Sequence, residues 1–184
     1  MIHCDIKPEN VLFKDLNFDS VIVIDFGSAT FISDVEYTYL QTRPYRAPEM
    51  VFGYPFDFAA DMWSLGCVLY EIVTKRILFN FKRTEDNIAK AFAICSSRSY
   101  DIFKEGKNYD SLIQKNQICR RNKSSQHKND LEIVRPNYNY DIIGDLISMD
   151  CDFKLIDFIK KCLEVDPSRR MTVEEAFDHD FILD

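Results

Sequence analysis

Residues 3–10 read HCDIKPEN, and this short polar loop decides how the rest of the chain is interpreted. It contains a carboxylate at Asp5, an ammonium at Lys7 and an amide at Asn10. Phosphoryl transfer to a hydroxyl needs a carboxylate that orients the nucleophile and accepts its proton. It also needs a cation that neutralises the moving phosphoryl group and a ligand for the Mg²⁺ that bridges the phosphates. One short loop can direct all three groups into a single cleft, so it indicates this chemistry.

Two apolar stretches downstream lead to a second acidic motif. Residues 11–13 (VLF) and 21–24 (VIVI) are rich in strand-forming residues and lie close enough in sequence to pair as a hairpin. The tripeptide DFG follows directly at residues 25–27. Alone it is weak evidence, because chance matches are common. Here it lies between residues 3–10 and the tripeptide APE at residues 47–49, and this order makes the signal specific.

These three motifs together resemble the protein-kinase signatures H-R-D-x-x-x-x-N, D-F-G and A-P-E. The resemblance implies an α+β, mainly α-helical, protein kinase-like fold, of which this chain holds the large lobe, truncated at its N-terminus. It implies ATP and Mg²⁺ as cofactors, with Asp5 as the catalytic base and Lys7 as the charge stabiliser at the nucleotide. Asn10 and Asp25 are, by the same resemblance, the Mg²⁺ ligands within the nucleotide-binding site.

Four further residues have structural roles by resemblance. Residues 61–66 (DMWSLG) look like the buried central helix of the kinase large lobe, where Asp61 bonds the catalytic-loop backbone. Residues 166–172 (DPSRRMT) look like a late segment of the same lobe, where Arg170 pairs with Glu49. His3 is structural in this family as well.

The kinase group is indicated by the activation segment. Residues 45–49 (YRAPE) resemble the CMGC group of cyclin-dependent, MAP, Clk and dual-specificity tyrosine-regulated kinases, and Arg46 matches that group's arginine. Cys4, in place of the usual arginine, and residues 37–43 (YTYLQTR) resemble the dual-specificity tyrosine-regulated, or Yak-like, kinases. Residues 28–31 (SATF) look more like Clk.

In those relatives the second tyrosine of the pair is autophosphorylated, which maps to Tyr39. A phosphotyrosine carries about −1.5 to −2 charge. Arg43 and Arg46 stand close enough in sequence to bind it through paired hydrogen bonds. Thr42 matches the threonine that, in the family, bonds the catalytic aspartate and lysine.

Apolar periodicity predicts four helices. One runs through residues 62–72 and is apolar around most of its surface, which indicates deep burial. Residues 84–95 and 155–162 give two amphipathic helices. A capping-box sequence at residues 172–175 (TVEE) opens the last helix.

Between them, residues 97–150 are polar and weakly periodic, which predicts a solvated insert. A docking surface for acidic partners is the alternative, because five basic residues lie there in a stretch without acids: Lys115, Arg120, Arg121, Lys123 and Lys128. We therefore divide the partial catalytic domain, residues 1–184, into a catalytic loop (1–13), an activation segment (25–49), a group-type insert (97–150) and C-terminal helices (151–184).

The composition excludes several classes of protein. A net charge of −7 argues against direct nucleic-acid binding. The six cysteines form no C-x-x-C pair and fit a reducing compartment. Residues 1–10 do not resemble a signal peptide, and no apolar run approaches the roughly 18–20 residues that span a bilayer. We expect a soluble intracellular monomer, cytoplasmic or nuclear, whose partners are protein substrates and which does not bind membranes.

The sequence allows more than one interpretation of the chain's activity. By resemblance the chain phosphorylates serine and threonine, with tyrosine autophosphorylation. No glycine-rich phosphate loop, strand lysine or hinge precedes residue 3, so we expect the chain alone to be an incompetent kinase. A catalytically inactive lobe that acts as a protein-binding module is the main alternative. A phosphotransferase of another kinase-like family fits less well, because such enzymes lack the APE segment.

Overall fold

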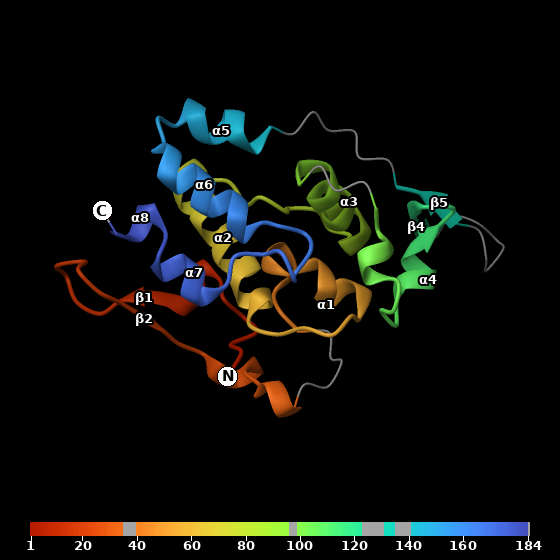
Figure 1. The fold of residues 1–184 in the computed structure, drawn as a ribbon, viewed down its shortest axis with the longest axis horizontal. Helices are drawn as coiled ribbons and strands as arrows, with labels where there is room; N and C mark the ends of the chain where they lie inside the picture. Colours follow the sequence, from red (N-terminus) through yellow and green to blue (C-terminus); the bar gives the residue numbers. More distant parts are fainter. Residues whose placement is uncertain (35–39, 96–98, 123–130, 135–140, 184) are drawn as a thin grey trace.

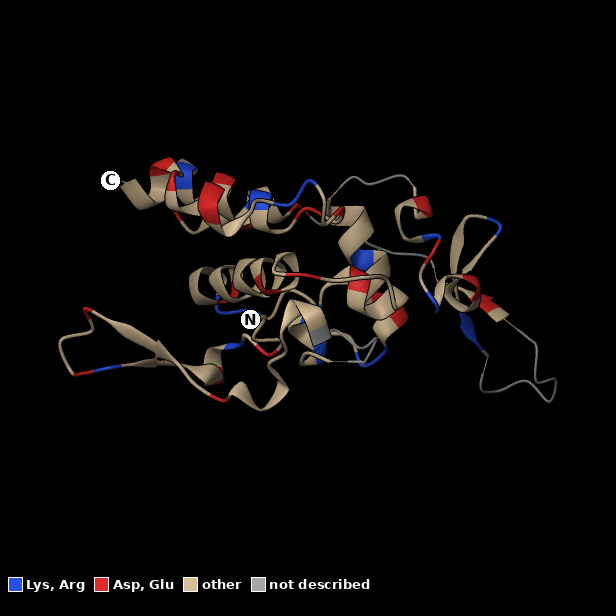
Figure 2. Ribbon diagram, turned by 60° about the horizontal axis from the view of Figure 1, so that its bottom comes forward, with Lys and Arg blue, Asp and Glu red and all other residues tan. Residues whose placement is uncertain are grey.

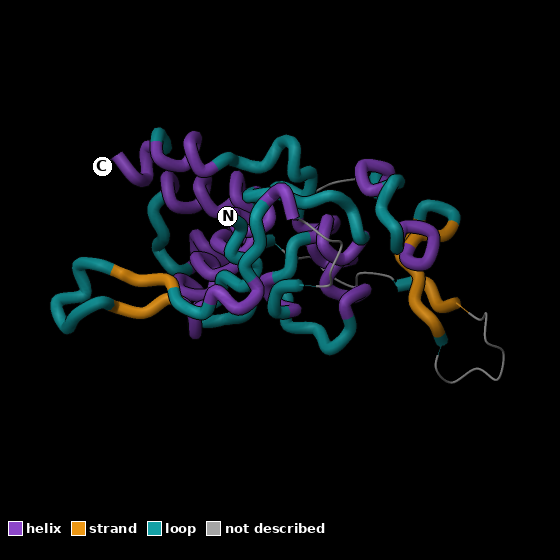
Figure 3. Tube along the Cα trace, turned by 90° about the horizontal axis from the view of Figure 1, so that it is seen from below, coloured by secondary structure: helices purple, strands orange, loops and turns teal. Residues whose placement is uncertain are grey.

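A computed structural model describes residues 1–34, 40–95, 99–122, 131–134 and 141–183. Helices form the body of the molecule, and two small antiparallel sheets lie at opposite ends of it (Figures 1 and 3). The predicted α+β, mainly α-helical class is therefore confirmed. The helices are α1 (Pro48–Phe52), α2 (Ala59–Thr74), α3 (Thr84–Ile94), α4 (Tyr109–Leu112), α5 (Ile142–Ser148), α6 (Phe153–Cys162), α7 (Val173–Phe177) and α8 (Asp180–Leu183). The strands are β1 (Val11–Phe13), β2 (Val21–Val23), β3 (Ile113–Gln114), β4 (Gln117–Arg121) and β5 (Leu131–Ile133).

Helix α2 is the centre of the core; it contains the helix predicted over residues 62–72 and is buried as expected, but extends beyond it at both ends. Trp63, Cys67 and Val68 on it are each at most 4% exposed. Gly66 lets α6 approach closely, because a Cβ at this position would lie 2.8 Å from the Cβ of Cys162. The remaining predicted helices are also confirmed: α3, α6 and α7, the last opened by a complete capping box.

The predicted hairpin forms, with β1 and β2 antiparallel and Leu12 opposite Ile22. It projects from the helical body, and its charged residues gather in the loop between the strands (Figure 2). Its apolar side chains are largely exposed, with Phe13 at 58% and Val21 at 56%. The strand-forming stretches were thus predicted correctly, although they contribute little to the core of this chain.

The expectation of a solvated segment at residues 97–150 is wrong for part of its described residues, although most of them are exposed. Phe103, Ile118 and Leu146 are at most 1% exposed and belong to the main core. Strands β3, β4 and β5 form a small sheet there, and α5 packs on α2. These elements are so short that each buries at most two side chains, so no periodicity could reveal them.

The basic residues of this segment were predicted to form a possible docking surface. Arg120 is instead bound by the chain's own acids, with Asp86 at 2.7 Å and Glu132 at 2.8 Å. This ion-pair network joins β4 and β5 to α3. Lys123 and Lys128 lie outside the described residues.

Candidate active site

The backbone of the catalytic loop is hydrogen-bonded to α2. Asp61, in the first turn of α2, accepts the N–H groups of His3 (2.7 Å) and Cys4 (3.0 Å). The His3 ring accepts the Asp5 N–H at Nδ1 (3.2 Å), so its Nε2 donates to the Ile24 carbonyl at 3.0 Å. His3 therefore ties the loop to the chain that enters the DFG tripeptide.

Asp5 is surrounded by hydrogen-bond donors. Its Oδ1 accepts both the N–H and the hydroxyl of Thr42, at 3.0 and 2.6 Å. Its Oδ2 accepts the Lys7 ammonium at 2.6 Å and the Asn10 amide at 3.3 Å. Lys7 also reaches the Thr42 hydroxyl at 3.3 Å, so residues from the loop and the activation segment meet at one carboxylate.

The charges of this cluster follow from its contacts. Burial is the largest single influence on Asp5 and opposes its ionisation, but the hydrogen bonds from Lys7 and Thr42 together lower its pKa. The hydrogen bond to Asp5 is the main cause of a raised pKa at Lys7. Both groups are therefore charged at neutral pH. Burial raises the pKa of Asp61.

A backbone hydrogen bond links Asn10 to the residue before Asp25. The Asn10 carbonyl accepts the N–H of Ile24, next to Asp25, at 2.9 Å. The Asn10 amide nitrogen donates to the Asp5 carbonyl at 2.9 Å, so Oδ1 is the atom of this side chain that would ligate a metal. Asp25 is exposed and has a positive φ of 63°, which turns its carboxylate back toward the Gly27 N–H at 3.3 Å.

This pair of oxygen donors fits Mg²⁺, which prefers carboxylate and amide oxygens and keeps several waters. Within the described residues, no three Asp, Glu, His or Cys side chains cluster tightly enough to hold a metal ion. Asn10 and Asp25 would therefore hold Mg²⁺ together with phosphate oxygens, and they would not form a closed protein cage.

Arg43 and Arg46, which were expected to bind phosphorylated Tyr39, both donate hydrogen bonds to backbone carbonyls. Arg46 donates from Nε and Nη2 to the carbonyls of residues 40–41. Arg43 is exposed and donates to the Lys82 carbonyl at 2.7 Å. Tyr39 lies outside the described residues, so its contact with these arginines stays a prediction.

The resemblance also assigned a scaffold pair, and the structure contains it. Arg170 and Glu49 form two parallel hydrogen bonds of 2.6 and 2.9 Å, and both side chains are fully buried. Arg170 lies over the Trp63 ring at 5.2 Å and donates to the Ala59 carbonyl at 2.7 Å. The end of the activation segment is thereby fixed to α2 and to the turn before α7.

Sequence reasoning missed part of the site's support. Gln41 is buried and bonds Ser64 on α2 at 3.1 Å. Tyr45 donates its hydroxyl to Glu71 at 2.7 Å, also on α2. The available signal was weak: Ser64 is a polar residue among the buried apolar residues of α2, where an unpartnered hydroxyl would be costly.

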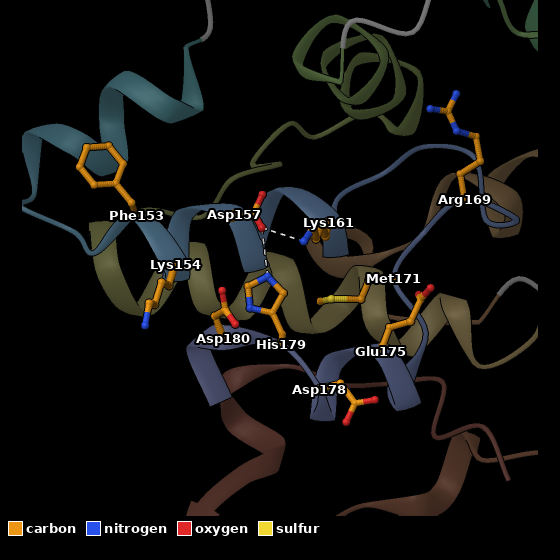
Figure 4. Close-up of a pocket in the computed structure, with 10 residues that line it drawn as sticks. All are labelled: Phe153, Lys154, Asp157, Lys161, Arg169, Met171, Glu175, Asp178, His179 and Asp180. Carbon is orange, nitrogen blue, oxygen red and sulfur yellow. Dashed lines mark hydrogen bonds and ion pairs between the residues drawn. The ribbon is translucent and has the colours of Figure 1, made fainter. Parts of the chain in front are cut away.

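A separate hollow lies between α6 and the α7–α8 turn (Figure 4). His179 is nearly buried there and bonds Asp157 at 3.1 Å, while Lys161 pairs with the same carboxylate at 2.8 Å. The Phe181 N–H donates to His179 Nδ1 at 3.1 Å. These contacts attach α8 to α6, and we assign the hollow no function.

The arrangement of loop, DFG and APE segments around α2 is that of a protein kinase, and a comparison with known families agrees. The family model described as "Protein kinase domain" matches residues 1–182, so the chain belongs to the protein kinase family.

Its relatives include dual-specificity tyrosine-phosphorylation-regulated kinases, as the motifs indicated. Kinase 4 of this name from Homo sapiens is 35% identical over 99% of this chain and 34% of its own length. Kinase 2 from Drosophila melanogaster is 34% identical over 99% of this chain and 24% of its own length. The chain thus spans about a third or less of these two relatives.

None of the helices in the described part of the chain is both long enough and apolar enough to cross a membrane. The six cysteines are all free thiols.

Proposed function

We propose that the chain carries the phosphoryl-transfer residues of an ATP-dependent protein kinase that modifies serine and threonine in protein substrates. The coordination of Asp5 is the observation that supports this best. Lys7, Asn10 and Thr42 supply four donors to its two oxygens, which fixes the direction of the carboxylate. Such pre-organised charge is what phosphoryl transfer requires of the protein.

The roles of the side chains follow from their charges. Asp5 has a lowered pKa and is a weak base, so it first orients the substrate hydroxyl as an acceptor and takes its proton late in transfer. Lys7 places a positive charge beside that acceptor and stabilises charge on the phosphoryl group. Asn10 and Asp25 would hold Mg²⁺, and Mg·ATP, when bound, would supply the phosphoryl group and its counter-charge.

A phosphotransfer assay tests this function. The chain is supplied with the nucleotide-binding small lobe of a relative, Mg·ATP and a basic protein substrate. Asp5→Asn should lower turnover about 10²–10⁴-fold, the usual share of a general base, because an amide cannot accept the proton. Exposed Asp19→Asn, in the hairpin loop, is the matched control and should transfer at the wild-type rate. A fully active Asp5→Asn protein would refute the assignment.

Metal binding gives a second test of the same site. Calorimetry should show Mg²⁺ binding only when nucleotide is present, because the two protein ligands need phosphate oxygens to complete the coordination. Tight Mg²⁺ binding to the chain without nucleotide would count against the assignment of Asn10 and Asp25.

We further propose that the active kinase carries phosphate on Tyr39. Arg43 supports this proposal, because it lies on the exposed surface of the activation segment, where a phosphate could reach it. Mass spectrometry of active enzyme should find Tyr39 modified, and Tyr39→Phe should reduce activity, whereas Tyr37→Phe should reduce it less. An active enzyme with unmodified Tyr39 would contradict the proposal.

The proposed setting is the interior of a cell, with proteins as substrates. All six thiols are free, and burial raises the pKa of Cys4, Cys95 and Cys162 to about 12. Such thiols are unreactive packing groups, as expected in a reducing compartment.

A further inference from the structure

Gln41 stands beside Thr42, the residue that gives Asp5 Oδ1 two of its donors. Its side chain is buried, and its backbone has a φ of 66°, in the left-handed region that few non-glycine residues occupy. A polar side chain held in this conformation needs partners that compensate for its burial.

The Gln41 amide has three such partners. Its Oε1 accepts the N–H of Ala47 at 2.8 Å. Its Nε2 donates to the Ala60 carbonyl and to the Ser64 hydroxyl, both at 3.1 Å. One amide therefore joins the two ends of the segment 41–47 to each other and to the beginning of α2.

The same turn of α2 supports both halves of the site. Asp61, between Ala60 and Ser64, carries the catalytic loop through two backbone hydrogen bonds. Ser64 also donates to the carbonyl of Tyr45 at 2.8 Å, which adds a second link to the activation segment. A helical turn of about 3.6 residues is rigid, so it sets the distance between the loop and the segment.

We propose that Gln41 is a positioning residue, whose amide holds Thr42 against Asp5 and so fixes the direction of the Asp5 carboxylate. Gln41 touches neither the carboxylate nor the site of transfer, and it acts through Thr42. The inference rests on the proposed kinase function for its meaning, but the contact between Thr42 and Asp5 forms without substrate and is measurable without it.

The experiment follows the Thr42 amide by NMR in the ¹⁵N-labelled 184-residue chain. Gln41→Met keeps the length of the side chain and removes its polar atoms. Hydrogen exchange of the Thr42 amide should become roughly tenfold faster, the factor that one lost buried hydrogen bond contributes. The amide of Cys67, in the middle of α2, should keep its wild-type rate. Gln114→Met, the same change at an exposed position of β3, is the matched control.

Ser64→Ala is the second variant, and it decides the question if Gln41→Met does not fold. It removes one partner of the amide and favours the helix, so Thr42 exchange should rise by a smaller factor. Unchanged Thr42 exchange in the folded variants would overturn the proposal. Equal acceleration at Thr42 and Cys67 would overturn it too, because Gln41 would then contribute only to global stability.

The activity assay adds a readout that separates this proposal from the proposed function. Gln41→Met should lower kcat without changing KM for ATP, and adding it to Thr42→Ala should cause no further loss. Independent, multiplicative losses would contradict action through Thr42. If the wild-type chain transfers no phosphate when the small lobe, Mg·ATP and substrate are supplied, the proposed function fails, whereas the NMR comparison still decides the role of Gln41.

Discussion

At the scale of single residues, Lys90 illustrates how burial sets a charge. It is 3% exposed, donates to the Leu78 carbonyl, and lies about 6 Å from the rings of Phe79 (5.9 Å) and Phe81 (6.0 Å). Burial lowers its pKa to about 8. Below pH 8, Lys90 is protonated in both the folded and the unfolded chain. Between pH 8 and the ordinary lysine pKa, the unfolded chain binds more protons at this side chain than the folded chain does. Stability contributed by this site therefore rises with pH above 8.

Lys90→Met tests this residue. Denaturant unfolding of wild type and variant should differ by a constant amount up to pH 8, and the difference should shift in favour of wild type at pH 9. Taking the difference cancels the contribution of the buried thiols Cys4, Cys95 and Cys162, because their raised pKa values make stability fall with rising pH equally in both proteins. Lys104→Met, the same change at an exposed position, is the matched control. If the free energies of unfolding of wild type and Lys90→Met changed in parallel with pH, the lowered pKa of Lys90 would be contradicted.

At the scale of elements, the packing of α2 on α6 depends on the absence of a side chain at Gly66. Alanine would gain about 1 kcal/mol of helix propensity there. Its Cβ, however, would lie 2.8 Å from the Cβ of Cys162 and 3.0 Å from the Cγ of Leu163. The Cβ of Cys162 is bonded to the backbone and cannot move aside. Overpacking costs about 1–3 kcal/mol, so Gly66→Ala should lower the free energy of unfolding.

The control for this substitution is Gly144→Ala in α5. There the nearest atom to the new Cβ is the Asp141 carboxylate, at 2.8 Å, which is the free end of a flexible side chain. The carboxylate can rotate away, so the helix-propensity gain should dominate and Gly144→Ala should be neutral or stabilising. Thermal melts that show Gly66→Ala to be as stable as Gly144→Ala would contradict the close approach of the two helices.

The same elements show what the sequence could predict. The long helices were predictable because each repeats its apolar face over several turns, as Met62, Leu65 and Leu69 do. The sheet of β3, β4 and β5 was not, since strands of two to five residues carry no period. The clustering of Asp5, Lys7 and Asn10 was predictable because these residues are close in sequence. The support from Gln41 and Ser64 was not, because 23 residues separate the two partners.

At the scale of the whole molecule, one buried ion pair connects segments 121 residues apart, Glu49 in α1 and Arg170 before α7. Both side chains are 0% exposed, and the guanidinium also donates to the carbonyls of Ala59, Glu164 and Val165. Burying two charges is costly, but removing one partner is costlier, because the other then remains buried without compensation.

The last prediction is therefore that Arg170→Met lowers the free energy of unfolding by about 3–5 kcal/mol. Replacing both residues, as Glu49→Gln with Arg170→Met, should cost less than Arg170→Met alone, because no uncompensated carboxylate remains. Lys161→Met is the matched control: its pair with Asp157 is about half exposed and should contribute only about 0–1 kcal/mol. Chemical denaturation measures all three. If Arg170→Met cost no more than Lys161→Met, the pair would not be the connection that holds the activation segment to the core.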